Sequence, residues 1–184
     1  MNKHDMTRNM VLAALFAALT AIGAFLQIPT GTVPITLQFL FTALAGLLLG
    51  WKWGAVSQLL YVGIGLLGLP VFTQGGGIGY VLQPSFGFLL GLIPAAAVIG
   101  ALTARRTGYL TVLAAVLVGD LILYAVGVPY MYLILHVYMQ SAKTFSALLA
   151  AMLVYVPGDT LKIIVVTALA PVLRRTLAKA VPNL

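Results

Sequence analysis

Long apolar runs, separated by short breaks rich in glycine, proline or charge, dominate this chain. No charged residue occurs between Met10 and Trp51. A membrane-spanning helix needs about 20 mostly apolar residues, and lipid offers no hydrogen-bond partners to the backbone, so the spanning elements must be helices or a closed barrel. These runs are continuous rather than alternating, which favours helices.

The breaks divide the chain into about six predicted spans. The expected spans cover residues 8–28, 33–50, 54–69, 83–103, 109–128 and 159–174. Residues 130–142 are aromatic-rich and are predicted to be interfacial or partly inserted. A further apolar stretch, residues 145–156, ends at Pro157-Gly158, and whether residues 145–174 form one kinked element or two stays open. The predicted fold class is an all-α integral membrane protein, a six-helix transmembrane bundle.

The composition supports this interpretation. Of the 184 residues, 62% are hydrophobic and 7% are charged, whereas soluble domains carry about 25% charged residues. We therefore expect residues 1–184 to form a single membrane-embedded domain. The apolar run after Arg8 is longer than the core of a signal peptide, so no cleaved leader is expected. The absence of cysteine excludes disulfides and thiolate metal sites.

The basic residues fall on one side of the predicted topology. With a cytoplasmic N-terminus, the cytoplasmic side holds Lys3, Arg8, Lys52, Arg105, Arg106, Arg174, Arg175 and Lys179. Only Lys143 falls on the outer side, and Lys162 lies within a span. This bias predicts a multi-pass protein of the cell membrane with both termini cytoplasmic.

Ionisable residues inside spans are candidates for a functional site. Asp159 and Lys162 are three residues apart and share a helix face directly after a Pro-Gly break, where free backbone N–H groups add positive potential. An acidic side chain, a basic side chain and free backbone N–H groups together suit a small molecule that carries a carboxylate and N–H donors. Alternatively, Asp159 only caps the helix, and Lys162 pairs with it or with Asp120, or snorkels outward. Asp120 is a site member or a pairing partner, and His136 is best interpreted as an interfacial residue.

Small residues at four-residue spacing allow close helix packing. Gly46, Gly50 and Gly54 show this spacing and predict internal packing. An alanine strip in the first span has the same spacing, and for it internal packing and a docking surface for a partner are both open. Its members are Ala13, Ala14, Ala17, Ala18 and Ala21.

The glycine-rich segment 75–79 lacks the Gly-Lys-Ser/Thr of a nucleotide-binding loop, so it is a pocket lid or a plain connector. No metal-binding or nucleophile motif is present, and the chain has three acidic residues in total. We therefore predict no catalytic residues, no metal and no resident cofactor.

Several sequence blocks, in this order, resemble the BioY family, the biotin-specific S components of energy-coupling factor (ECF) transporters. They are Val33 to Gln38, Leu49 to Tyr61, Gly65 to Phe72, Gly75 to Tyr80, Pro84 to Gly91, Gly127 to Tyr130, and Pro157-Gly158-Asp159-Thr160-Leu161-Lys162. The resemblance implies six membrane helices, a vitamin pocket near the outer face, and high-affinity biotin binding and uptake. It also implies three partner subunits, a transmembrane coupling protein and two ATPases that hydrolyse ATP, with the alanine strip docking on the coupling protein.

By this resemblance, Asp159 would accept hydrogen bonds from the ureido N–H groups of biotin. Lys162 would bind the carboxylate, although the two residues could share the polar end differently. Further pocket residues expected from their positions are Tyr80, Gln83, Phe86, Asp120 and Tyr155. Residues 84–88 read Pro-Ser-Phe-Gly-Phe where the family pattern would have Pro-Thr-Gly-Gly-Tyr, so Phe86 is expected to narrow the pocket or to change its lining.

Three other functions stay open at this point. The chain could be an S component for another vitamin, such as riboflavin or thiamine. It could be a membrane-embedded enzyme that uses Asp120 and Asp159, although no nucleophile or metal set accompanies them. It could also be an assembly subunit that binds no small molecule.

Overall fold

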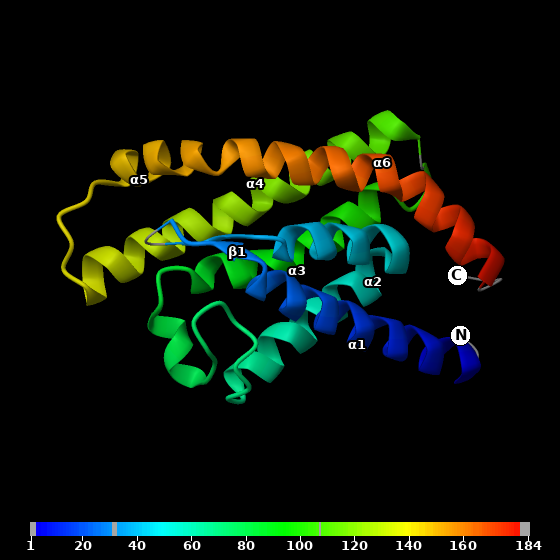
Figure 1. Cartoon of the computed structure of the whole chain (residues 1–184), viewed down its shortest axis with the longest axis horizontal. Helices are drawn as coiled ribbons and strands as arrows, with labels where there is room; N and C mark the ends of the chain where they lie inside the picture. The colour runs from blue at the N-terminus through cyan, green and yellow to red at the C-terminus, as the bar shows by residue number, and fades with distance from the viewer. Residues whose placement is uncertain (1–2, 31–32, 107, 181–184) are drawn as a thin grey trace.

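The computed structural model describes residues 3–30, 33–106 and 108–180, and these residues are predominantly helical (Figure 1). The elements follow one another as α1 (Lys3–Phe25), β1 (Gln27–Ile28), β2 (Ile35–Thr36), α2 (Gln38–Leu66), η1 (Ile78–Leu82), α3 (Phe86–Leu102), α4 (Tyr109–Leu133), η2 (Ile134–Tyr138), α5 (Phe145–Ala151), η3 (Met152–Val154) and α6 (Val156–Ala180). Among the described residues, four helices are long and apolar enough to cross a membrane, namely residues 4–25, 38–66, 109–138 and 156–176. The two shorter apolar helices are α3 and the α5–η3 segment.

Helix α2 is a hairpin of two helical halves that folds at Gly50. Gly50 has φ 77° and ψ 178°, a conformation that is nearly exclusive to glycine. On either side of it, Thr42 donates a hydrogen bond to Gln58 (2.9 Å), and a Cβ atom on Gly54 would lie 2.8 Å from the Cα atom of Gly46. The two predicted spans 33–50 and 54–69 correspond to the two halves of α2, residues 38–50 and 51–66, which confirms a break near Trp51.

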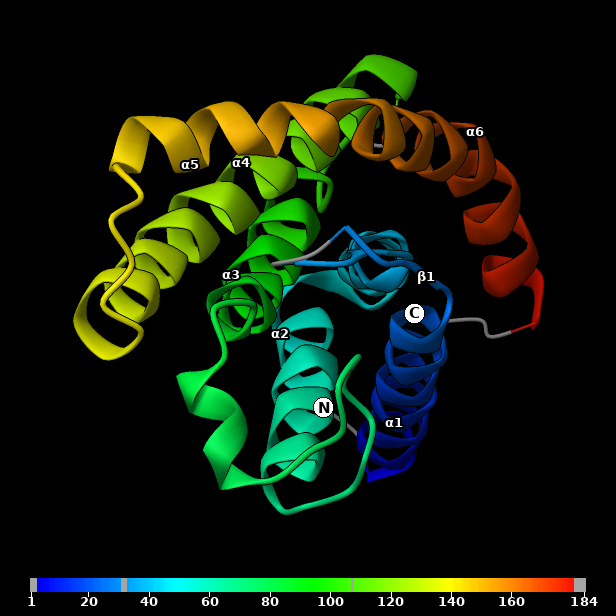
Figure 2. The ribbon, with the colours of Figure 1, turned by 60° about the vertical axis from the view of Figure 1, so that its left-hand side comes forward.

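The helices pack in the order α1, α2, α3, α4, with α6 lying against α4 and α2. Small residues permit the close approaches: a Cβ atom on Gly46 would collide with the Ala96 backbone of α3, so this glycine packs internally as predicted. Helix α5 leads directly into the start of α6 beside α4, and α6 then bends away toward its end (Figure 2). The stretch from residue 145 to residue 180 is therefore one continuous but interrupted and bent helical segment, made of α5, η3 and α6.

The start of α1 and the end of α6 lie at the same end of the molecule (Figure 1). Arg174, near the end of α6, donates hydrogen bonds to the carbonyl oxygens of Leu47 (2.7 Å) and Thr103 (3.4 Å). These contacts place the α2 fold and the end of α3 at the same end as the termini. The β1–β2 hairpin pairs Gln27 with Thr36 and lies between the end of α1 and the start of α2, at the opposite end.

Several predicted boundaries are wrong. The span expected from residue 33 begins at Gln38, the span expected to reach residue 69 ends at Leu66, and the helix expected from residue 159 begins at Val156. The first helix ends at Phe25 rather than at residue 28, because the chain turns into the β1–β2 hairpin before Pro29. The helix expected from residue 83 begins at Phe86, since η1 and Pro84 precede it. The helix expected to stop at residue 128 continues through Pro129 as α4 and η2.

Packing explains how α4 continues through Pro129. Proline removes one backbone hydrogen bond, but neighbouring helices can hold a kinked membrane helix together. Val128 and Met131 are fully or almost fully buried, and the Tyr130 hydroxyl donates to the Val81 carbonyl (2.6 Å). The first half of the segment predicted to be interfacial therefore belongs to a spanning helix.

Candidate ligand pocket

A pocket with polar and apolar walls opens at the end of the bundle opposite the termini. The connection between α1 and α2, the glycine-rich loop and the starts of α3 and α6 all contribute to it. Its lining residues are Val33, Pro34, Ile35, Thr36, Gln38, Phe39, Thr73, Tyr80, Ser85, Phe88, Leu89, Leu92, Leu123, Tyr124, Met152, Tyr155, Asp159 and Lys162, around a cavity of about 70 Å³.

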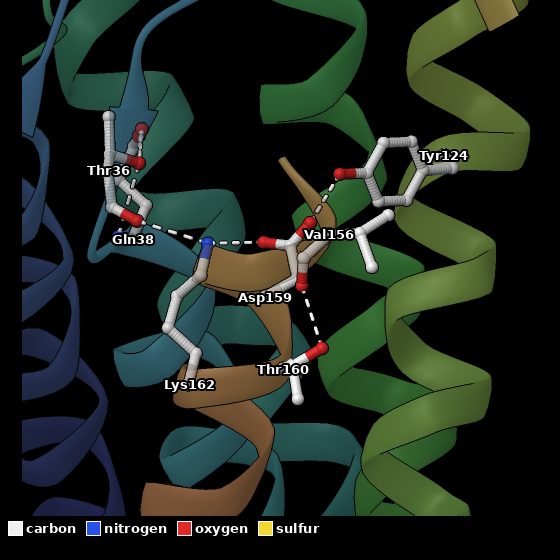
Figure 3. A network of polar contacts seen from close by, with 7 residues as sticks. All are labelled: Thr36, Gln38, Tyr124, Val156, Asp159, Thr160 and Lys162. Atoms are coloured by element: carbon white, nitrogen blue, oxygen red, sulfur yellow. Dashed lines mark hydrogen bonds and ion pairs between the residues drawn. The ribbon is translucent and has the colours of Figure 1, made fainter. Parts of the chain in front are cut away.

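Asp159 and Lys162 form a buried ion pair in this pocket, with Nζ of Lys162 lying 2.5 Å from Oδ1 of Asp159 (Figure 3). Asp159 is 7% exposed and Lys162 is 8% exposed. Because they are three positions apart in α6, they share one face of the helix. Nζ of Lys162 also donates to the carbonyl oxygen of Thr36 (3.3 Å), which ties α6 to β2.

The second oxygen of Asp159 accepts a hydrogen bond from the Tyr124 hydroxyl of α4 (Figure 3). Asp159 lies in the first turn of α6, and its backbone N–H donates to the Tyr155 carbonyl (2.9 Å). Its side chain is thus directed into the pocket and does not cap the helix. The capping interpretation is therefore wrong. Pro157 occupies the start of α6, where a missing N–H costs little.

The opposite wall of the pocket carries an amide and hydroxyl groups. Gln38 donates to the Tyr61 hydroxyl (2.7 Å) and accepts from Thr36 (2.9 Å), which fixes its side chain. The Thr73 hydroxyl lies 2.9 Å from the Tyr80 hydroxyl. The remaining lining side chains are largely apolar, so the pocket offers a few fixed polar groups among hydrophobic walls.

The glycine-rich loop is held to the bundle by aromatic rings. Phe72 and Tyr80 are buried and their ring centroids are 4.6 Å apart. Tyr61 contacts Phe72 from one side, and Phe86 contacts Tyr80 from the other. Through Thr73 and Tyr80, the loop is therefore part of the pocket wall as well as a connector.

The structure brings four of the seven predicted ligand residues to the pocket: Asp159, Lys162, Tyr80 and Tyr155. Gln83 is exposed, and Phe86 is buried between the rings of Tyr80 and Tyr130. The lining side chains from this region are Ser85 and Phe88 instead, because α3 begins only at Phe86 and its rotation turns those two positions inward.

Asp120 does not line the pocket. It lies one helical turn from Tyr124 on α4, and its Oδ1 is buried with no hydrogen-bond partner among the described residues. His136 stacks on Tyr132 near the end of η2, with ring centroids 5.3 Å apart and planes at 14°. Within the described part of the chain, no group of histidine, cysteine and acidic side chains could hold a metal ion.

Sequence reasoning missed Thr36, Gln38, Thr73 and Tyr124 as pocket residues. Gln38 and Thr36 offered a signal, since polar side chains are rare in a run that is otherwise apolar. Tyr124 offered little signal in the sequence, because its hydrogen bond with Asp159 depends on how α4 packs against α6.

The alanine strip of α1 is divided by the structure. Ala13 and Ala17 are buried in the core, whereas Ala14 and Ala18 are exposed. A groove of about 370 Å³ runs between α1 and the second half of α2. Its lining residues are Ala14, Ala17, Ala18, Ala21, Ile22, Leu60, Tyr61, Ile64 and Val71. Ala13 therefore packs internally, Ala14 and Ala18 face outward in the groove, and Ala17 is buried at the base of the groove.

Comparison with known proteins decides the family. The BioY family model matches residues 1–179 of the chain. The chain belongs to the BioY family. A protein named "Probable biotin transporter BioY" from Lysinibacillus sphaericus is 51% identical over 148 residues, covering 79% of this chain and 76% of the relative. The "Biotin transporter BioY" of Thermotoga maritima is 35% identical over 164 residues, covering 89% and 94%.

A solved structure agrees with this BioY assignment. It is described as the S-component for biotin from an ECF-type ABC transporter, and it matches with a TM-score of 0.83 and 29% identity over 95% of each chain. The predicted family and the predicted helical membrane fold are confirmed. Together with four long apolar helices, they make this BioY protein a multi-pass membrane protein of the cell membrane.

Proposed function

We propose that this BioY protein binds biotin and takes it up across the cell membrane as the substrate-binding S component of an ECF-type transporter. The observation that carries the proposal is the Asp159–Lys162 pair, buried in a pocket with apolar walls. The relatives with the same family assignment are named biotin transporters, and the similar solved structure is a biotin S component. This is a transport function, not an enzymatic one.

The two charges suit the ureido ring of biotin. A ureido group offers N–H donors and one carbonyl oxygen and carries no net charge. The ion pair is also neutral overall, so such a ligand binds without leaving a buried charge uncompensated. Asp159 would accept from a ureido N–H, and Lys162 would donate to the ureido oxygen.

The apolar walls suit the sulfur-containing ring. Phe88, Leu89 and Leu123 line the pocket beside Tyr124. Removing apolar surface from water contributes about 25 cal/mol per Å². A bicyclic ligand therefore gains affinity from these walls, while the polar groups fix its orientation.

Uptake would require partner subunits. The sequence holds no Gly-Lys-Ser/Thr loop for a nucleotide. We propose that a transmembrane coupling subunit and two ATPases supply the energy, with the coupling subunit docking at the groove beside Ala14 and Ala18. The groove is largely apolar, and four alanines of α1 line one side of it; small side chains permit close helix approach in a membrane.

Retention of radiolabelled biotin by the purified full-length protein tests the binding function. We expect unlabelled biotin to displace the label and riboflavin and thiamine to leave it in place. Displacement by riboflavin or thiamine but not by biotin would assign the protein to another vitamin. No retention of any of the three would contradict the binding function.

A further inference from the structure

A second, larger cavity lies beside the pocket. It has a volume of about 320 Å³ and is lined by Thr30, Met131, Lys143, Ala147, Leu148, Ala151, Met152, Val154 and Tyr155. Met152 and Tyr155 line the pocket as well. The two cavities therefore share a wall, and we call the larger one the outer cavity.

Tyr155 forms this wall through its hydroxyl group. The hydroxyl donates to the carbonyl oxygen of Val33 and lies 2.9 Å from Oγ1 of Thr30. These contacts hold the tip of the ring between the start of α6 and the connection that follows α1, while the half-buried ring packs against a cluster of apolar side chains that includes Val33 and Met152. Tyr155 and Met152 are therefore the two side chains that line both cavities.

The two cavities together offer a polar floor and additional space beside it. Pockets for small molecules usually measure about 300–1,000 Å³. The pocket, at about 70 Å³, holds the polar floor, and the outer cavity, at about 320 Å³, adds room for a chain. Only together do they combine a polar floor with a volume in the usual range. A ligand with a polar head and an aliphatic tail would fill this shape.

The charges indicate which end of such a ligand lies where. Lys162 in the pocket is already neutralised by Asp159. Lys143 lines the outer cavity, and within the described residues no carboxylate lies within ion-pair distance of it. The chain has only three acidic residues, of which Asp5 pairs with Arg8. A ligand carboxylate therefore finds an available cation in the outer cavity.

We propose that the outer cavity binds the aliphatic chain and carboxylate of the ligand, with Lys143 pairing with the carboxylate and Tyr155 turning aside to admit the chain. This assignment rests on the proposed biotin-binding function and gives the two ends of the ligand separate sites. The ureido head lies at Asp159 and Lys162, and the valerate tail passes Met152 toward Lys143.

Charge removal at Lys143 tests the carboxylate site. Biotin and biotinamide, whose tail is uncharged, are bound to the purified full-length protein in nanodiscs. We expect Lys143→Gln to weaken biotin binding about three- to fivefold, the range of a partly exposed ion pair, and to leave biotinamide binding unchanged. Lys52→Gln, an exposed lysine at the opposite end of the bundle, should change neither ligand. An equal effect of Lys143→Gln on both ligands, or no effect on biotin, would overturn the proposal.

Filling the outer cavity tests the site of the chain. Ala151→Phe places a ring in the outer cavity without changing the ion pair. We expect it to weaken biotin binding by more than about tenfold, because added bulk in an occupied site displaces the ligand, and to spare an analogue with a methyl group in place of the valerate chain. Equal losses for both ligands would refute the tail site. Failure of the wild-type protein to retain biotin would instead refute the proposed function, so the two failures are distinguishable.

Discussion

The Tyr124 hydroxyl of α4 donates a hydrogen bond to Oδ2 of Asp159 in α6, while Lys162 occupies Oδ1. The carboxylate is therefore held from two helices, with each of its oxygens assigned to one partner. A side chain fixed in this way loses little conformational freedom when a ligand binds. The arrangement makes Tyr124 a positioning residue for the pocket.

Tyr124→Phe should weaken biotin binding by about fivefold, because one hydrogen bond of about 1 kcal/mol no longer orients the carboxylate. Equilibrium binding to the purified variant measures the effect. Tyr132→Phe is the matched control, since Tyr132 stacks on His136 and does not line the pocket. Equal affinities for the Tyr124 variant and the control would show that this hydrogen bond does not contribute to binding.

The buried ion pair allows stability and binding to be separated. Lys162→Met leaves Asp159 as an uncompensated buried charge, so it should lower the free energy of unfolding by about 3–5 kcal/mol. The double variant Asp159→Asn/Lys162→Met removes both charges and should recover most of that loss. Thermal unfolding in detergent measures this pattern.

The biotin affinities of these variants should not follow their stabilities. Asp159→Asn, Lys162→Met and the double variant should all lose most of their affinity, because each removes a polar partner of the ligand. A stable double variant that binds biotin like the wild type would place the ligand elsewhere.

The fold of α2 depends on one backbone conformation. Gly50→Ala should destabilise the protein by about 1–3 kcal/mol, since φ 77° with ψ 178° strains any residue with a Cβ atom. Gly63→Ala is the matched control. Gly63 lies inside the second half of α2, and a Cβ atom there meets nothing within 4 Å, so helix propensity should make this change neutral or slightly stabilising. Similar melting temperatures for both variants would contradict the strain argument.

Arg174 joins three helices at the end of the bundle that holds the termini. Its guanidinium donates to Leu47 in α2 and to Thr103, which follows α3. Arg174→Gln should therefore destabilise the protein by about 1–3 kcal/mol, as expected when charge-assisted hydrogen bonds to carbonyl groups are lost. Arg175→Gln changes an exposed neighbour and should leave the melting temperature within error. Equal melting temperatures for the two variants would show that the hydrogen bonds of Arg174 do not stabilise the fold.

The sequence predicted the spans well because apolar runs and their breaks are local features. The break at residues 51–53, between the predicted spans 33–50 and 54–69, marked the fold of α2, and Pro157 marked the start of α6. The conformational role of Gly50 was not predicted, since its spacing was interpreted as internal packing. The pair Asp159–Lys162 was also visible, since helical spacing alone puts the two on one face. These features require no knowledge of how the helices pack.

The rest of the pocket depends on contacts between distant segments. Tyr124 and Asp159 are 35 positions apart and meet only through the packing of α4 on α6. The rotation of α3 decides that Phe88 rather than Phe86 faces the pocket. Pro129 predicted a helix end, but burial on both sides of it outweighed the lost hydrogen bond. Such outcomes follow from packing, which a single sequence does not show.

The division of the alanine strip gives a sharp test of docking. Ala17 is 4% exposed and packs in the core, so a large residue there would disturb the fold itself. Ala18 is exposed and lines the groove beside α2. Ala18→Trp should therefore fill the groove and prevent co-purification with the coupling subunit and ATPases, while biotin binding by the isolated protein stays unchanged.

Ile164→Trp provides the control, because Ile164 is 52% exposed on α6, away from the groove. It adds comparable bulk to an apolar surface and should leave the complex intact. Recovery of the whole complex with Ala18→Trp would move the docking surface away from α1. Loss of the complex with both variants would mean that added bulk anywhere on the surface disturbs assembly, and the groove would then have no special role.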